Sequence, residues 1–353
     1  MDAQETGIYT SLLWSRLRAS GGLRWPGSSL RYTYLSDEGD DPAALNPRRK
    51  RAQMAKTTQN EWAPKAARLI QSLQQRTFTQ RDLGNFLNRE REHLGIPKSI
   101  GVNKFIDILS EEGKLSSIEL VREVRTRAGV KLRPGVTRFA WGEPSVYDIA
   151  LSLRSGSYLS HGTAVLLHGL TDRMPKTLYT NKEQSPKPRS RRSLSQAAID
   201  RAFKAAQRAS NYIFTWEGYR FVLLSGKHTG RLEVSQIEGE AGEILDITTI
   251  ERTLIDITVR PVYAGGVYEV MAVFREARDQ GISVDTLVKT LKKLDYLYPY
   301  HQAIGFYLER AGFAEDHLKK LRSMTMDFDF YLTHKISDSE YESGWRLYYP
   351  SGL

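Results

Sequence analysis

The sequence predicts an α+β protein, in which a small helical module with a β-hairpin precedes a larger domain of mixed helices and strands. Apolar residues recur at helical spacing in three short runs between residues 62 and 112. Two runs with the composition of strands, 117–124 and 132–141, follow directly. Beyond residue 144, strand-like and helix-like stretches succeed one another without a repeat of about 20 to 50 residues, which argues against a solenoid.

Composition places the chain among soluble globular proteins. It has 353 residues, enough for two or three domains, and 40% of them are hydrophobic. No apolar run approaches the ~18 residues of a membrane span, and the N-terminus lacks the order of a signal peptide, so we expect a cytoplasmic protein without a membrane partner. The absence of cysteine excludes disulfides and thiolate metal sites. A net charge of +10 favours a polyanionic partner, most often nucleic acid.

Residues 1–60 differ from everything after them. They are rich in Gly, Pro, Ser and Arg and lack a sustained period, which predicts a disordered extension. The basic run 48–51 is either a phosphate contact or a solvated linker. Met54 is also a suitable start for the ordered protein, and a mis-assigned start codon would explain the extension.

Three helices are predicted next. Pro64 suits the first position of the first helix, and Thr79 is a good N-cap for the second. A break at 95–99 precedes a third helix over 101–112. Three short helices with a tight break before the third resemble a helix-turn-helix, and the two strands that follow make a basic wing. We therefore predict a winged helix-turn-helix over residues 61–143 and a mixed α+β domain over residues 144–353.

Basic residues are concentrated in the first of these domains. Residues 65–142 contain fifteen Lys and Arg against eight Asp and Glu, which supplies +7 of the total +10. The start of the third helix can reach base edges in a major groove, and wing residues can neutralise phosphates. The residues predicted to contact double-stranded DNA are Lys98, Ser99, Asn103, Lys104, Arg125, Arg127, Lys131 and Arg138. The alternative is a protein-interaction module with a solvated basic face.

The second domain is predicted to begin with short helices over 146–154 and 160–169, the latter capped by Ser160. His161 and His168 share a face of that helix. Because no third ligand stands at a usual spacing, we interpret them as core or capping histidines rather than a metal site.

A second basic cluster follows. We expect a strand over 176–179, a polar loop over 181–192, and a helix capped by Ser193. The cluster consists of Arg189, Arg191, Arg192, Arg201, Lys204 and Arg208. It is either an extension of the DNA contact or a solvated helix face.

Strands are predicted at 212–216, 219–225, 231–238 and 243–246, the first two joined by a turn at 217–218. Thr248 to Glu251 then fits a capping box, so a helix should start there and end at Pro261. Glu251 and Asp256 are either catalytic carboxylates or a cap and an ion-pair partner. We favour the structural interpretation, because each charge already has a helical explanation.

Helices over 267–279, 283–293 and 298–311 precede terminal strands at 328–333 and 345–349. The sequence contains no Walker A, GxGxxG, GxSxG or HExxH motif. Asp327 and Asp329 form a DxD pair, so the alternative function is a metal-dependent nuclease or nucleotidyltransferase that uses both carboxylates. Because a Gly-Ser phosphate loop does not precede the pair, we predict neither an enzyme nor a cofactor.

Three motifs resemble the AbiEi-type antitoxins, transcriptional regulators of type IV toxin-antitoxin systems linked to abortive infection by phage. They are YLSHGTA at 158–164 with HGL at 168–170, TIERTLID at 249–256 followed by RP and YAGG at 260–266, and YHQAIGFYL at 300–308. Together with the predicted winged helix they extend the resemblance from about residue 62 to the C-terminus.

The resemblance implies an N-terminal winged helix that binds and represses the operon's own promoter. It also implies a C-terminal domain that relieves the toxicity of a nucleotidyltransferase toxin. Type IV classification implies that the antitoxin counteracts the toxin without forming a stable complex with it. The long N-terminal extension departs from the family pattern.

Overall fold

The structure is a computed structural model that describes residues 61–73, 75–126, 129–188 and 193–353. Residues 62–353 form one compact unit. The predicted disordered extension lies outside the described residues, as do Arg127, Arg189, Arg191 and Arg192. Within the described part of the chain, no helix is long and apolar enough to cross a membrane.

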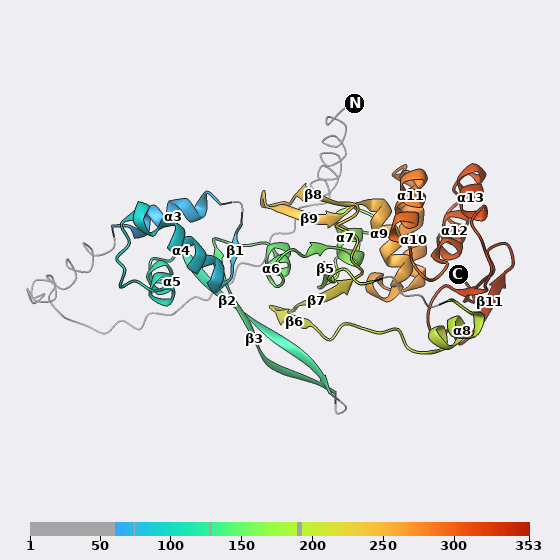
Figure 1. The fold of residues 1–353 in the computed structure, drawn as a ribbon, viewed down its shortest axis with the longest axis horizontal. Coiled ribbons are helices and arrows are strands. Elements are labelled where there is room, and N and C mark those ends of the chain that lie inside the picture. The colour runs from blue at the N-terminus through green and yellow to red at the C-terminus, as the bar shows by residue number, and fades with distance from the viewer. Residues whose placement is uncertain (1–60, 74, 127–128, 189–192) are drawn as a thin grey trace, which may run out of the picture. The chain divides into compact units, whose positions relative to one another are not determined.

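Helices and strands are mixed along the chain, which confirms the predicted α+β class (Figure 1). The helices are α3 (Ala63–Gln71), α4 (Gln80–Leu94), α5 (Val102–Glu111), α6 (Val146–Ser152), α7 (His161–Leu167), α8 (Gln196–Lys204), α9 (Ile250–Val259), the 3₁₀ helix η1 (Pro261–Ala264), α10 (Val267–Asp279), α11 (Val284–Leu294), α12 (Tyr300–Arg310) and α13 (Glu315–Arg322). The strands are β1 (Thr77–Phe78), β2 (Leu115–Thr126), β3 (Gly129–Trp141), β4 (Tyr158–Leu159), β5 (Thr177–Glu183), β6 (Ile213–Trp216), β7 (Tyr219–Gly226), β8 (Val234–Glu238), β9 (Ile244–Thr248), β10 (Phe330–Tyr331), β11 (Ser339–Glu342) and β12 (Leu347–Pro350).

Helices α3, α4 and α5 pack around one small core. α3 has a proline in its first turn and α4 has Thr79 as its N-cap, as the sequence predicted. Thr79 Oγ1 accepts from the Asp82 N–H at 3.1 Å, and the Asp82 carboxylate accepts from the Thr79 N–H at 2.8 Å, so both free amides are satisfied. The indole of Trp62 stacks on Phe105 with 5.5 Å between ring centroids. This contact joins the start of α3 to the buried face of α5.

One sheet of nine strands runs through much of the compact unit, in the order β1-β3-β2-β6-β7-β5-β4-β9-β8. β2 and β3 form a long antiparallel hairpin, and β2 also pairs with β6 at residues 121–123. This pairing joins residues on the two sides of the domain boundary predicted between residues 143 and 144. The boundary itself remains a prediction. The hairpin is irregular beside Gly135, where a Cβ would lie 2.0 Å from the Leu120 carbonyl oxygen, so the position requires glycine.

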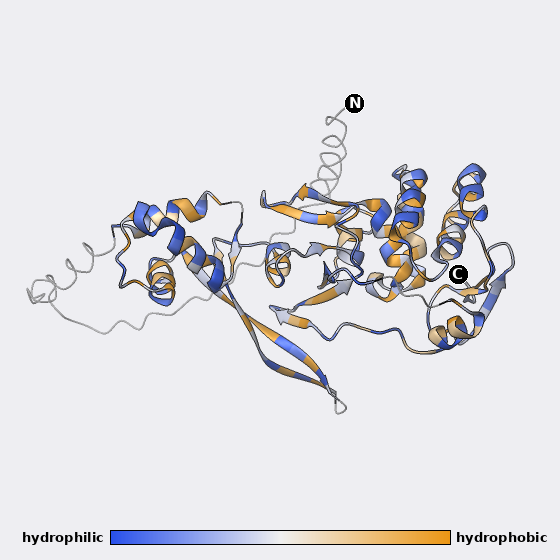
Figure 2. Ribbon diagram, viewed as in Figure 1, coloured by the Kyte–Doolittle hydropathy of each residue, from blue (hydrophilic) through white to orange (hydrophobic). Residues whose placement is uncertain are grey.

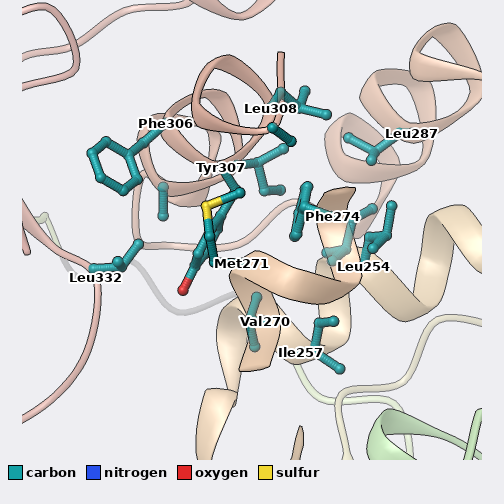
Figure 3. Close-up of a cluster of buried hydrophobic side chains, with 14 of the residues drawn as sticks. Leu254, Ile257, Val270, Met271, Phe274, Leu287, Phe306, Tyr307, Leu308 and Leu332 are labelled. Carbon is teal, nitrogen blue, oxygen red and sulfur yellow. The ribbon is translucent and has the colours of Figure 1, made fainter. Parts of the chain in front are cut away.

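Helices α9 to α13 enclose the largest hydrophobic core (Figure 3). Leu254 and Ile257 of α9 are fully buried in this core. Phe274 of α10 stacks on Tyr307 of α12 with 4.9 Å between ring centroids. This aromatic stack fixes α10 against α12.

Several predicted helix starts and loops are wrong. Thr249 rather than Thr248 caps α9, accepting from the Arg252 N–H, while the Glu251 carboxylate accepts from the Ser283 N–H at 3.1 Å. The predicted capping box is therefore replaced by a single cap and a contact to the start of α11.

In the region predicted as a polar loop, residues 181–183 belong to β5. Asn181 is buried there, donating to the Tyr158 hydroxyl at 2.7 Å and accepting from the Gly226 N–H at 2.8 Å. Its polarity is satisfied inside the sheet, which composition alone did not indicate. Ser195 rather than Ser193 caps α8, and β1, β4, β11 and α13 were not predicted.

Candidate nucleic-acid interface

The turn between α4 and α5 is held by an arginine outside the predicted DNA contacts. Arg91 donates one guanidinium hydrogen bond to the Pro97 carbonyl at 2.7 Å and another to the Ile100 carbonyl at 2.9 Å. These bonds fix the direction in which α5 begins. The predicted contacts Lys98 and Ser99 lie in this turn, and both are exposed.

Asn103 and Lys104 lie exposed in the first turn of α5, while Phe105 on the other side of the helix is buried. The Asn103 Oδ1 accepts from the Gln80 Nε2 at 2.5 Å, which leaves its amide N–H groups able to donate. Lys104 makes no hydrogen bond or ion pair within the described residues. Asp107, one turn after Asn103, is also exposed and was not predicted. A carboxylate here can accept a hydrogen bond from a cytosine amino group but repels phosphate.

A surface groove of about 510 Å³ runs between α4, α5 and β3. Gln80 and Arg81 line it from α4, and Asn103 and Asp107 line it from α5. The sequence interpretation treated α4 only as scaffold and so missed Gln80 and Arg81. Their position directly after the N-cap Thr79, at the exposed start of the second helix, is the signal that identifies them.

One face of the β2–β3 hairpin is basic. Cross-strand partners lie on the same face, and the register pairs Arg122 with Arg133 and Val124 with Lys131. Lys131 was predicted from the sequence, whereas Arg122 and Arg133 were not, although Lys131 and Arg133 stand two apart and so share a face of any strand. The Arg122 guanidinium also lies over the ring of Tyr212, 5.4 Å from its centroid.

The opposite face of the hairpin is largely apolar. Leu132 and Val130 are 66% and 59% exposed, and the register places Arg125 opposite Val130. The predicted contact Arg125 therefore lies on the other face from Lys131, although both are close to the tip. The wing cations do not form the single basic surface that the sequence suggested.

Arg138 does not fit a phosphate contact. It is 8% exposed, and its guanidinium donates to the carbonyls of Thr137 at 2.8 Å, Ser152 at 3.1 Å and Leu153 at 3.4 Å. Burial lowers the pKa of this guanidinium. The prediction is wrong because Arg138 stabilises the C-terminal end of α6, where free carbonyls need donors.

The base of the hairpin is joined to the larger sheet by an ion pair. Arg220 of β7 donates from its Nε to both carboxylate oxygens of Glu123, at 2.9 and 3.1 Å, and from a terminal nitrogen at 3.0 Å. The side chains are 33% and 12% exposed, respectively. Together with the pairing of β2 and β6, this contact fixes where the hairpin leaves the sheet.

The second basic cluster is only partly a single surface. Arg201 and Lys204 are exposed on α8. Arg208 is exposed as well, but α8 ends at Lys204, so Arg208 does not lie on the predicted helix face. Its carbonyl accepts a hydrogen bond from Arg260 at 3.4 Å.

The charged residues of α9 have structural partners. Arg252 donates to Asp256 at 2.9 Å in an ion pair whose side chains are 4% and 7% exposed, and it also donates to the Leu232 carbonyl at 2.8 Å. This arrangement supports the structural interpretation of Asp256. A buried pair that lacks access from solvent is poorly suited to act on a substrate.

His161 begins α7, and His168 directly follows its last residue. His161 has its Nδ1 3.0 Å from the Ser160 hydroxyl oxygen, and burial lowers its pKa to about 4. His168 has its Nε2 2.6 Å from the Thr248 carbonyl oxygen, and burial lowers its pKa too. These contacts support the interpretation of both residues as core or capping histidines. Within the described residues, no group of three or more His, Cys, Asp or Glu residues is arranged to hold a metal ion.

The DxD pair lies just before β10 rather than along it. The Asp329 carboxylate accepts from Arg346 at 2.9 Å and from the Tyr341 hydroxyl at 2.8 Å, whereas Asp327 is exposed. The two carboxylates therefore do not lie together on one face of a strand. The alternative of a metal-dependent nuclease or nucleotidyltransferase relied on such a paired arrangement. Asp329 has the contacts of an ion pair at the edge of the small β10-β12-β11 sheet.

No family model and no curated protein matches the chain. Among solved structures, the chain is similar to the RV2827C protein from Mycobacterium tuberculosis. The two chains are 15% identical, with a TM-score of 0.47, and the alignment covers 82% of this chain and 91% of that chain. A similarity of this degree carries no functional argument, so the function has to be inferred from the residues of this chain.

Proposed function

We propose that residues 61–143 form a winged helix-turn-helix that binds double-stranded DNA, and that the protein is a transcriptional repressor and antitoxin of a type IV toxin-antitoxin system. The observation that carries the DNA-binding part is the collection of exposed cations on two adjacent elements. Lys98 and Lys104 flank the start of α5, and Lys131 and Arg133 share one face of the hairpin. None of these four cations has an ion-pair partner among the described residues.

In this proposal the first turn of α5 enters the major groove. Asn103 reads a base edge, and Lys104 contacts guanine or phosphate. The basic face of the hairpin, defined by Arg122, Lys131 and Arg133, lies along the phosphate backbone and supplies affinity without sequence preference.

The antitoxin part rests on the motifs that resemble AbiEi-type antitoxins. Gly162 in the first motif approaches the second so closely that a Cβ would lie 2.7 Å from the Tyr263 carbonyl oxygen. The first two motifs therefore pack directly against each other. Residues outside them would act on the toxin, a nucleotidyltransferase, without a stable complex.

The DNA-binding part is tested with a fluorescently labelled duplex taken from upstream of the protein's own gene, by anisotropy at several salt concentrations. Asn103→Ala should reduce the preference for this duplex over a scrambled one by about tenfold. Replacing Arg122, Lys131 and Arg133 together with Gln should weaken binding to both duplexes and reduce the salt slope by about 2 to 3.

A matched control removes the same charge elsewhere, by replacing Lys289, Lys292 and Lys293 of α11 with Gln. Its affinity for DNA should stay near that of the parent. Equal loss in both triple variants would mean that net charge rather than the hairpin drives binding, and the proposal would fail. The antitoxin part predicts that an adjacent gene encodes a nucleotidyltransferase whose expression is toxic. Co-expression of this protein with that nucleotidyltransferase is the test, and either the lack of such a gene or unchanged toxicity would refute the antitoxin part.

A further inference from the structure

One exposed carboxylate stands among the residues proposed to read DNA. Asp107 lies one turn after Asn103 on α5 and lines the groove between α4, α5 and β3. Among the described residues, it is the only acidic side chain of that lining. Figure 2 shows mostly hydrophilic segments along α4, which forms one wall of the groove. Asp107 therefore belongs to the polar surface that the proposed function turns toward DNA.

The Asp107 carboxylate has no partner. Within the described residues it makes neither a hydrogen bond nor an ion pair, although Arg81 lines the same groove from α4. Asn103 differs, because its Oδ1 accepts from the Gln80 Nε2 at 2.5 Å. Both oxygens of Asp107 are thus available to accept hydrogen bonds from a ligand.

An unpaired carboxylate is unfavourable on a surface that meets DNA. It repels the phosphates, and it loses hydration when the helix enters the major groove. A hydrogen-bond donor on a base edge offsets both effects. Guanine and thymine present only acceptors there, and adenine presents its amino group beside the N7 acceptor, which repels a carboxylate. Cytosine presents its N4 amino group alone, so it is the base that best matches Asp107.

We propose that Asp107 is a specificity-determining residue that selects cytosine by accepting a hydrogen bond from its N4 amino group. This inference rests on the proposed function, because it requires α5 to enter the major groove. Asn103 and Asp107 are separated by about 6 Å along the helix axis, and neighbouring base pairs by about 3.4 Å. The two side chains therefore read positions about two base pairs apart.

The test selects bound sequences from a duplex library with a randomised core, using the full-length protein. At one position the parent should enrich cytosine about tenfold over the other bases. Asp107→Ala should lose the preference at that position alone. Asp107→Asn should change it to adenine, whose donor and acceptor both match an asparagine amide. Asn103→Ala should lose the preference at a position about two base pairs away.

Glu92 of α4 supplies the matched control. It is exposed, makes no ion pair within the described residues and lies outside the groove lining. Glu92→Ala removes the same charge and should keep every base preference of the parent. In anisotropy measurements with a scrambled duplex, Asp107→Ala should bind about fivefold more tightly than the parent, because repulsion at the phosphates is lost. Glu92→Ala should stay within about twofold of the parent, because its charge is farther from the groove and screened by salt.

The possible failures are distinguishable. A sequence preference of the parent that both Asp107 variants retain would overturn the role of Asp107 and leave DNA binding by α5 intact. Loss of the cytosine preference in Glu92→Ala would also overturn it, since net charge rather than position would then decide. A parent that enriches no sequence would refute the proposed function, and this inference with it. Because Asp107 is exposed, all variants should keep the melting temperature of the parent.

Discussion

The ion pair between Glu123 and Arg220 should contribute measurably to the stability of the compact unit. Three charged hydrogen bonds of 2.9 to 3.1 Å join the two side chains, so this contact is stronger than an ordinary exposed ion pair. Hydrogen bonds to charged groups contribute about 1.5 to 3 kcal/mol, but Arg220 is one-third exposed and water can replace part of the interaction. We therefore expect a coupling free energy of about 1 kcal/mol.

The coupling is measured with Glu123→Gln, Arg220→Gln and the double variant, by urea denaturation followed by circular dichroism. Each single change should lower the free energy of unfolding, and the double change should cost less than the two single changes added together. The same cycle on Arg278 and Asp279, an exposed pair at 2.7 Å, should give a coupling near zero. If Glu123 and Arg220 prove additive to within about 0.3 kcal/mol, the contact does not anchor the hairpin.

Two further perturbations test the core. The pKa of buried His161 is lowered to about 4, below its unfolded value near 6.5, so the unfolded state binds the proton more strongly and stability falls as the pH decreases from 6.5 toward 4. At pH 5 the free energy of unfolding of the parent should be about 2 kcal/mol lower because of this group. In His161→Asn, where asparagine tolerates the φ of 52°, stability should depend less steeply on pH. Identical pH profiles of the two proteins would contradict the lowered pKa of His161. Gly305→Ala would put a Cβ 2.2 Å from the Trp345 ring and should cost about 1 to 3 kcal/mol in denaturation experiments. Gly84→Ala, whose Cβ would meet only Val102 at 3.6 Å, is the matched control and should be neutral or stabilising.

Sequence reasoning worked where a local rule decides the structure. Thr79 caps α4, the turn at 217–218 joins β6 to β7, and α10 spans 267–279, all as predicted. In each case the signal lies within a few neighbouring residues, in a cap, a turn or an apolar period. Tertiary contacts did not need to be known.

Sequence reasoning failed where a partner distant in the chain decides the role of a residue. Arg138 appeared to belong to a basic wing, yet its acceptors are the Ser152 and Leu153 carbonyls at the end of α6. Asn181 appeared to lie in a loop, yet Tyr158 and Gly226 satisfy it inside a sheet. Composition counts polar groups but does not show which of them will be satisfied in the interior.

In the candidate interface, the exposed residues in the first turn of α5 were predicted. The distribution of the hairpin cations over two opposite faces was not. Lys131 and Arg125 are near one another in the sequence, but strand alternation and the register place them on opposite faces. A one-residue change of register would exchange those faces, so the pattern becomes readable only once the pairing is known.

The pairing of β2 with β6 determines how the chain can be divided. A fragment ending near residue 142 keeps β2 but removes β6, and the backbone groups of residues 121–123 lose their hydrogen-bond partners. The complementary fragment begins its sheet with β6 as an uncovered edge, and such edges recruit strands from other molecules. A fragment intended to carry the proposed DNA-binding module without aggregating should therefore extend at least through β7, to Gly226. Exchanging this module between related proteins would require the register of Val121, Arg122 and Glu123 against β6 to be kept.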